Sequence, residues 1–403
     1  MIKLTRTIYP VGMGGFVSER FFRDDTCSEF CMVYDCGSDT HGMNTRISSI
    51  ITNELSKVDV LFISHFHRDH INQVTKLPIT KETKVFIPWL YNPYILLKEY
   101  LYNMEYTSLV NWLKQNATVI FIDPFQIGGN HSLSAIEEYD PEKEEYILPI
   151  VNLSDGQHVN PLLRISVPDF EWCYIPFHLQ DNTVFDFFIN EAFKAGFAKE
   201  KLENFDVEDK PFVRKVCRLY KKVCKQFFGA ENLNYSTMLL ASRILNSTNY
   251  LYWQATECFW KHCYHPYRYD GRLFESYRNP SCLFTGDTPL NIDSFRIAFK
   301  TLVPKIMNSE VGLLQLPHHG SKNGYISDIW QITHAQHAFV HCVENPGLHQ
   351  PVLCPHIYFD SSRIGAFFYP VSEKEDTLFE ETLYLARHMA EIWKKINLHG
   401  KYE

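Results

Sequence analysis

Short apolar runs separated by turn-forming residues fill the first 90 positions of the chain and predict β-strands. Val60 to Ile63 and Val85 to Pro88 are two such runs, each with the length and composition of a buried strand. Residues Thr45 to Leu55 instead place apolar side chains three and four positions apart, which predicts a helix. This part of the chain therefore predicts a mixed arrangement of strands and helices.

Residues 89–230 follow a different pattern and predict a mixed α/β insertion. The segment 89–113 is rich in Tyr and Leu and favours helix, whereas 118–122 is typical of a strand. Residues 156–168 favour a hairpin. The segment 182–228 predicts two helices, and the second has apolar side chains on one face and lysine and arginine side chains on the other.

The rest of the sequence predicts further strands and one terminal helix. The strands are expected near residues 235–245, 250–256, 283, 313 and 338–342. Residues 374–396 space their apolar side chains as an amphipathic helix does. We expect residues 1–403 to form a single domain that contains the insertion.

Composition places the chain in the ordinary globular class. Hydrophobic residues make up 45% and charged residues 21% of its 403 positions. No apolar run reaches the ~20 residues that span a bilayer, and the N-terminus lacks the apolar core of a signal peptide. Eleven cysteines occur without a C-x-x-C pair and predict free thiols. We therefore expect a cytoplasmic protein with no membrane partner.

Net charge limits the kinds of substrate to consider. The chain carries −8 at neutral pH, whereas proteins that grip long duplexes through phosphate contacts usually present a basic face. The negative net charge favours a small substrate, or a short nucleic-acid strand held locally, over general duplex binding. The basic face of the second helix in 182–228 has two interpretations, a lid that contacts phosphate or a solvated helix surface.

The densest chemistry lies directly after the strand at Val60 to Ile63. Within the segment Ser64 to His70, the six positions from 65 to 70 contain three imidazoles and a carboxylate, which are ligand types that zinc or manganese prefers. In an extended segment His65 and His67 point the same way and can grip one ion, while Asp69 and His70 can aim at a second ion. A polar loop that happens to be rich in histidine is the alternative, but an H-x-H-x-D-H string after a strand favours metal.

These residues resemble the signature of the metallo-β-lactamase fold superfamily of metallohydrolases. Three further segments occur in the order that this family shows: a strand with Asp35, a strand that ends in Gly286-Asp287, and Pro317-His318-His319-Gly320-Ser321. The last segment resembles the P-H-H-G-S block of the ComEC-like branch, which includes the nuclease-like domain of DNA-uptake proteins and phosphorylcholine esterases. The resemblance implies an α/β (α+β) fold, a four-layer αββα sandwich with two metals at one edge.

The resemblance also implies roles for individual residues. It assigns six metal ligands: His65, His67, Asp69, His70, Asp287 and His318. Asp287 would bridge the two ions, Asp69 would also orient the attacking water, and His319 would face the substrate or support a ligand. Which of the two adjacent histidines ligates stays open. Asp35 is expected to fix a ligand imidazole.

Two segments leave the assignment incomplete. His349 lies in a segment that resembles the N-x-x-G-H-P block of the same branch, where it would donate a proton or serve as a structural turn residue. Most superfamily members supply a further histidine to the first metal, whereas Asn234-Tyr235-Ser236 resembles the N-x-S segment of the ComEC-like branch. One metal site is therefore expected to be weak, and His131, His158 or His178 could replace the missing ligand.

The resemblance implies a hydrolase that uses two divalent ions, zinc or manganese. A divalent cation lowers the pKa of bound water from ~15.7 toward ~7 and can clamp both oxygens of a phosphoester. The expected substrate is a nucleotide, single-stranded nucleic acid or another phosphoester. Two alternatives remain: a thioester, lactone or lactam hydrolase on the same fold, and a catalytically weak binding or effector protein with a partner protein docked on the insertion.

Overall fold

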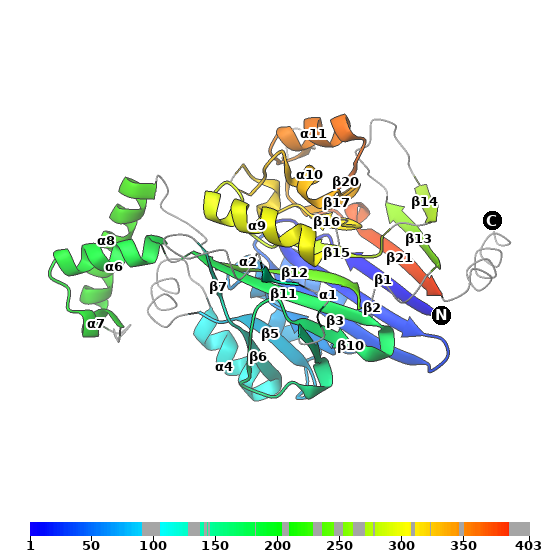
Figure 1. Ribbon diagram of the computed structural model, residues 1–403, viewed down its shortest axis with the longest axis horizontal. Coiled ribbons are helices and arrows are strands. Elements are labelled where there is room, and N and C mark those ends of the chain that lie inside the picture. The colour runs from blue at the N-terminus through cyan, green and yellow to red at the C-terminus, as the bar shows by residue number, and fades with distance from the viewer. Residues whose placement is uncertain are drawn as a thin grey trace.

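Figure 1 shows the computed structural model of the chain. The described residues are 1–90, 105–127, 138–140, 143, 146–181, 183–203, 209–228, 236–245, 253–260, 271–276, 279–307, 311–322, 324–345 and 350–386. They form a mixed α/β structure built on two large sheets with helices packed against them.

Sheet A contains ten strands among the described residues. Their order is β14 (Gly271–Ser276), β13 (Trp253–Trp260), β21 (Phe379–Ala386), β1 (Ile2–Ile8), β2 (Gly14–Arg23), β3 (Ser28–Ser38), β4 (Val60–Phe62), β5 (Lys84–Pro88), β6 (Thr118–Ile122) and β9 (His158–Val159). The pairs from β14 to β3 are antiparallel, and those from β3 to β9 are parallel.

Sheet B has nine described strands. The order is β20 (Phe367–Val371), β17 (His337–His341), β16 (Leu313–Gln315), β15 (Cys282–Phe284), β12 (Ser236–Ile244), β11 (Trp172–Asp181), β10 (Arg164–Val167) and β8 (Ile147–Pro149), with β7 (Phe125–Ile127) beside β11. The strands β15, β16, β17 and β20 are parallel to one another. A short ribbon joins β18 (Glu344–Asn345) to β19 (Gln350–Pro351).

The inner faces of the two sheets pack on each other. Tyr34 of sheet A stacks on Phe284 of sheet B with ring centroids 4.8 Å apart, and Phe62 contacts Tyr174 at 5.4 Å. One apolar cluster contains fully buried side chains from both sheets. Burial of each aromatic side chain in this layer contributes about 1.5–3 kcal/mol, so this interface supplies much of the stability of the fold.

Helices occupy the outer faces. The described helices are α1 (Met43–Glu54), α2 (Arg68–Ile71), α4 (Tyr106–Asn116), α6 (Thr183–Lys194), α7 (Lys199–Glu203), α8 (Lys210–Phe228), α9 (Asp293–Ile306), α10 (Ile329–Thr333) and α11 (His356–Ile364). Helix α1 packs on β3 and α4 on β6 of sheet A, whereas α9 packs on β11 of sheet B and α10 packs on α9. In Figure 1, α6, α7 and α8 stand outside the sheets as an arm, shown in green at the left.

A buried ionic network joins the two sheets. Arg6 on β1 donates from Nε to Glu19 on β2 (2.7 Å) and from Nη1 to Glu381 on β21, and all three side chains are almost completely buried. From sheet B, Tyr174 and Ser242 donate to the other oxygen of Glu19 at 3.0 and 2.7 Å. Buried charges require such partners, and this set fixes β21 beside β1 and sheet B above both.

The structure corrects two sequence predictions. A helix over 374–396 is wrong as far as residue 386, because Glu375–Thr377 is a single 3₁₀ turn and Phe379–Ala386 is the strand β21. The side chains of Phe379, Glu381, Leu383 and Leu385 are buried at every second position, which is the strand period. The hairpin over 156–168 is also wrong, because β9 pairs with β6 in sheet A and β10 pairs with β11 in sheet B.

Two elements predicted near the N-terminus are confirmed. The helix expected at Thr45 to Leu55 is α1, and the strand before the histidine cluster is β4. The range 89–230, predicted as an insertion, contains strands of both sheets, and among its described elements the arm α6–α8 is the part that stands outside them. Among the described residues, no helix combines the length and the apolar character needed to cross a bilayer.

Candidate metal centre

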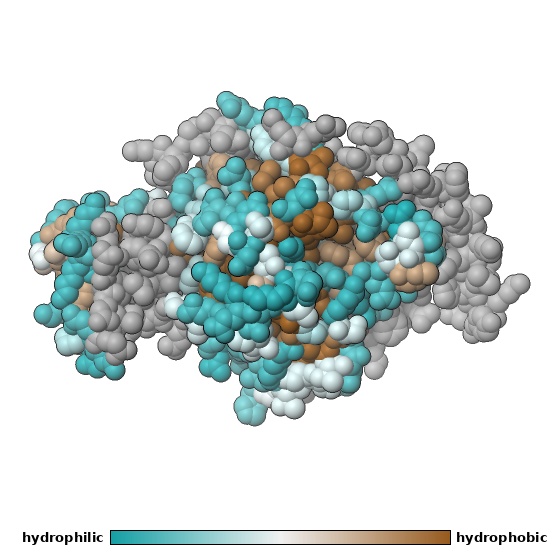
Figure 2. Space-filling model, turned by 90° about the horizontal axis from the view of Figure 1, so that it is seen from below, coloured by the Kyte–Doolittle hydropathy of each residue, from teal (hydrophilic) through white to brown (hydrophobic). Residues whose placement is uncertain are grey.

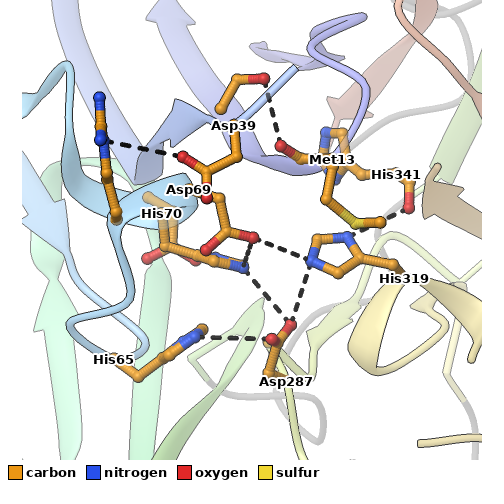
Figure 3. Close-up of polar contacts among 12 residues, drawn as sticks. Met13, Asp39, His65, Asp69, His70, Asp287, His319 and His341 are labelled. Carbon is orange, nitrogen blue, oxygen red and sulfur yellow. Dashed lines mark hydrogen bonds and ion pairs between the residues drawn. The ribbon is translucent and has the colours of Figure 1, made fainter. Parts of the chain in front are cut away.

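Four of the six predicted ligands converge, together with His319, where parallel strands of both sheets end. His65 follows β4 in sheet A, while Asp287 and His319 follow β15 and β16 in sheet B. Asp69 and His70 lie on the single-turn helix α2, directly after the β4 loop. Loops beyond the carboxyl ends of parallel strands are common places for binding sites, because side chains from separate strands meet there. Figure 3 shows the five side chains directed toward one another.

Two groups of potential ligands share this location. In the first, His65 Nε2 lies 3.6 Å from Asp287 Oδ2, and His70 Nε2 lies 3.4 Å from Asp287 Oδ1. In the second, Asp69 Oδ2 lies 3.3 Å from His319 Nε2 and 3.6 Å from His70 Nε2. Asp287 Oδ1 is also 3.6 Å from His319 Nε2, so its carboxylate contacts both groups.

These separations fit ligands around a cation better than direct hydrogen bonds. An N–H···O bond has donor and acceptor ~2.7–3.2 Å apart. Two ligands that are each ~2.0–2.1 Å from a tetrahedral zinc lie roughly 3.3 Å from each other. The measured 3.3–3.6 Å match the second value, so the arrangement has room for a cation between the side chains.

The imidazoles are anchored so that one nitrogen of each faces the cluster. His70 Nδ1 contacts Asp35 Oδ2 at 2.8 Å, His65 Nδ1 contacts Ser64 Oγ at 2.9 Å, and His319 Nδ1 contacts the carbonyl oxygen of His341 at 3.3 Å. The Nε2 atoms of all three rings are buried and have no hydrogen-bond partner. Each such atom costs about 1–3 kcal/mol when left unpaired. Three of them aimed at two carboxylates therefore fit a bound metal.

Asp35 holds the imidazole of His70, one of the candidate ligands, which agrees with its predicted supporting position. It is the extra residue of a β-bulge, opposite the register shift between Phe16 and Val17, and its φ is 55°. The bulge directs its carboxylate to accept from Ser64 N (2.8 Å) and Ser64 Oγ (2.7 Å) as well as from His70. Bulges commonly redirect a side chain in this way. Since Asp35 is fully buried, it holds the β4 loop and α2 in one geometry.

Two glycines permit the close approach of α2 to the sheet. A Cβ atom on Gly15 would lie 2.9 Å from His70 Nδ1, and one on Gly37 would lie 2.7 Å from the carbonyl oxygen of Asp69. Both distances are shorter than van der Waals contact. Glycine is therefore required at these positions for α2 to present Asp69 and His70 to the cluster.

The histidine and aspartate side chains of the cluster shift one another's pKa values. Burial holds the pKa of His65 well below its ordinary value, so that ring is neutral. Burial also opposes charge on His70, but the carboxylates of Asp69, Asp287 and Asp35 raise the pKa of His70 well above its ordinary value. Burial would raise the pKa of Asp287, but His319, His70 and His65 hold it well below its usual range. A divalent cation would replace these protons, so its binding is expected to weaken at low pH.

The P-H-H-G-S segment contributes its second histidine to the cluster. His318 and His319 both have positive φ, 51° and 54°, within the 3₁₀ turn His318–Gly320. This conformation is strained for non-glycine residues and separates the two rings, whose centroids are 6.4 Å apart. Among the described residues, His318 belongs to neither ligand group, and His319 belongs to one.

The other predicted residues lie outside the two ligand groups or outside the described part of the chain. The His67 ring is 4.6 Å from that of His65, and it lies outside the two ligand groups found among the described residues. Asn234, Tyr235, His131 and His349 lie outside the described residues. His158 contacts Asp123 at 2.7 Å on the surface, away from both ligand groups. Two residues that were not predicted also support the site: Ser64, which directly precedes the histidine string, and His341, whose carbonyl orients His319.

His178 has a structural role instead of replacing the missing ligand. It is fully buried, with Nε2 2.7 Å from Ser236 Oγ and Nδ1 3.1 Å from the carbonyl oxygen of Ile122. These contacts join β11 to the first residue of β12 and to the end of β6. Burial lowers the pKa of His178 to about 4, so the ring is neutral at neutral pH.

His178 is expected to make the protein acid-sensitive. The stabilisation from a neutral His178 is complete above its unfolded pKa of 6.5 and is lost as the pH falls from 6.5 toward about 4. The loss should reach about 3 kcal/mol, because each pKa unit corresponds to ~1.4 kcal/mol. His178→Gln keeps hydrogen-bonding groups without titrating, so urea unfolding at several pH values should show a flatter profile for this variant. Parallel profiles for the two proteins would contradict the prediction.

The site as described is a candidate dinuclear metal centre made of histidine and aspartate side chains from both sheets. Comparisons with protein-family models, curated proteins and solved structures found no match for the chain.

Proposed function

We propose that the protein is a metal-dependent hydrolase of the phosphodiesterase or nuclease-like type, with two zinc or manganese ions as cofactors. The observation that carries the proposal is the set of three buried imidazole Nε2 atoms without partners, gathered around an aspartate that contacts both ligand groups. Hydrolytic two-metal centres use such a set of side chains to activate water and to hold the oxygens of a phosphoester.

The proposal includes the finer fold assignment. Two facing sheets with helices outside both, and a site at the edge where the parallel strands end, support a four-layer αββα sandwich of the metallo-β-lactamase type. The order of Asp35, the histidine string, Asp287 and the P-H-H-G-S segment along the chain supports the ComEC-like branch. The substrate would then be a nucleotide, single-stranded nucleic acid or another phosphoester.

Individual residues of the chain would have separate roles in the proposed reaction. Bound divalent cations supply Lewis-acid activation of water and of a phosphoryl oxygen. Asp287 contacts both ligand groups, and its negative charge would offset the positive charge of the bound cations. Asp35 and the His341 carbonyl keep the Nε2 atoms of His70 and His319 turned inward. Asp69 is the more exposed of the two cluster carboxylates, with 14% of its side chain accessible against 7% for Asp287, so it is placed to accept a proton from an entering water.

The test is hydrolysis by protein purified without chelator. We expect turnover of bis(p-nitrophenyl) phosphate that rises with added manganese or zinc and disappears with EDTA. Metal analysis should find about two ions per chain, and metal should raise the melting temperature, because ligands of the folded state stabilise it. Absence of bound metal would refute the proposal, and turnover of a thioester without any phosphodiester would assign the centre to acyl hydrolysis.

A further inference from the structure

Helix α8 has an unusual charge for this chain. It contains seven lysine and arginine residues and no aspartate or glutamate, although the whole protein carries a net charge of −8. Runs of like charge along a helix repel one another and reduce its stability. A helix of this composition therefore gains stability when an anion lies against it.

The positive residues share one face of α8. At ~100° per residue their positions fall within an arc of about 140°. All seven are exposed: Lys210, Arg214, Lys215, Arg218, Lys221, Lys222 and Lys225. The opposite arc packs against α6, where Val213, Tyr220 and Val223 are buried and the Tyr220 ring contacts Phe188 with centroids 5.2 Å apart. The apolar face is therefore occupied inside the protein.

Five of these cations form no ion pair with a described acidic side chain, although Lys215 is near enough to Asp209 to contribute, after Lys201, to the lowered pKa of that carboxyl. No described acidic side chain forms an ion pair with Arg214, Lys215, Arg218, Lys221 or Lys222. Lysines elsewhere in the arm do form pairs, since Lys194 contacts Glu191 at 2.6 Å and Lys201 contacts Asp209 at 3.0 Å. In Figure 2 the described surface of the arm, at the left, is mainly hydrophilic.

The arm joins sheet B beside the candidate metal centre. It follows β11, and β12 returns the chain to sheet B at Ser236. Two residues later, Met238 N donates to the carbonyl oxygen of Ser64 at 2.9 Å, directly before His65. The contact between His178 and Ser236 holds the ends of β11 and β12 together at the same edge. The arm therefore joins sheet B at the edge that carries the candidate metal centre.

We propose that the exposed face of α8 binds the phosphate backbone of single-stranded nucleic acid and guides it to the metal centre. The choice of partner rests on the proposed phosphodiesterase function. A flexible strand can follow the arm and then enter a cluster of buried side chains, whereas a rigid duplex cannot bend over so short a path. A membrane surface is disfavoured because interfacial helices insert an apolar face, and that of α8 is covered by α6.

The proposal predicts a salt dependence. Neutralisation of Z phosphates of a single strand makes log K fall with log salt with a slope of about −0.7Z. Five cations give a slope of about −3.5, so affinity should fall on the order of 10²-fold between about 50 and 200 mM KCl. Replacing Lys215, Arg218 and Lys222 by Gln removes three contacts and should reduce the slope by about 2.

Fluorescence anisotropy of a labelled oligothymidylate tests this directly. The full-length protein is titrated in EDTA, so that hydrolysis plays no part and the result is independent of the proposed activity. The control variant Lys57→Gln/Lys81→Gln/Lys114→Gln changes three exposed lysines outside the arm and removes the same number of positive charges. A second variant, Lys215→Arg/Lys222→Arg, keeps the charge and should bind as the unaltered protein does, and circular dichroism verifies that each variant is folded.

Loss of binding on the order of 10²-fold at low salt in the α8 variant, with binding retained in the control, supports the proposal. Equal affinities for the α8 and control variants, or an unchanged salt slope, would overturn it. Binding to vesicles that contain phosphatidylserine but not to the oligonucleotide would assign the face to a membrane and also overturn it. Hydrolysis of bis(p-nitrophenyl) phosphate with added metal reports separately on the proposed function.

Discussion

Asp287→Asn is expected to lower phosphodiester hydrolysis on the order of 10³-fold and to leave at most one tightly bound divalent ion per chain. The carboxylate of Asp287 contacts members of both ligand groups, with Oδ2 3.6 Å from His65 Nε2 and Oδ1 3.6 Å from His319 Nε2. An amide keeps the shape but removes the negative charge that offsets two cations. Metal analysis and turnover of bis(p-nitrophenyl) phosphate measure the two effects.

A matched control for this variant lies a few residues downstream. Asp293→Asn makes the same change at the start of α9, where the side chain is 76% exposed and pairs with Arg296. We expect it to keep both metals and normal turnover. If Asp287→Asn behaved in the same way as Asp293→Asn, the candidate centre would not be the site of hydrolysis.

Asp35→Ala is expected to destabilise the metal-free protein by about 3–5 kcal/mol. The change removes a buried carboxylate that accepts three hydrogen bonds, from Ser64 N, Ser64 Oγ and His70 Nδ1. It leaves those donors without a partner, and it leaves charged His70 with less compensation in the interior. Urea unfolding at about pH 7 in EDTA measures the effect without contributions from metal.

The Asp35→Asn variant removes the charge of the Asp35 side chain but keeps a residue that tolerates the backbone conformation at this position. Asparagine tolerates the left-handed conformation at φ 55° and still accepts a bond from Ser64, so it should cost less than alanine. It should also weaken metal binding by about 10–100-fold, because His70 loses its charged support. A loss below about 1 kcal/mol for Asp35→Ala would show that the bulge holds its shape without the carboxylate.

The candidate centre was largely predictable because its signals are local. The spacing of His65, Asp69 and His70 follows directly from β4 and α2, and the order of motifs placed Asp287 with them. The choice between His318 and His319 was not predictable. It depends on two successive positive φ angles, which turn the second ring toward Asp69, and no side-chain pattern encodes such backbone strain.

The strand β21 shows why part of the fold could not be predicted. Its segment has apolar residues that fit both a helical and an alternating pattern, so periodicity alone leaves the choice open. Tertiary context decides, since β1 offers an unpaired edge and Arg6 offers a buried charge that Glu381 satisfies. Periodicity also does not show that β9 and β10, which are neighbours in sequence, belong to different sheets.

The position of β21 has a consequence for biosynthesis. Its seven-residue ladder with β1 joins Ile2 to Leu385, so the ribosome must translate nearly the entire described chain before this ladder can form. Until then the nascent protein presents an open strand edge at β1 and the guanidinium of Arg6 lacks Glu381. Such edges recruit other chains, and late closure of long-range pairs slows folding. Sheet A is therefore completed only after β21 has been synthesised, and chaperone supply should influence the yield of native protein.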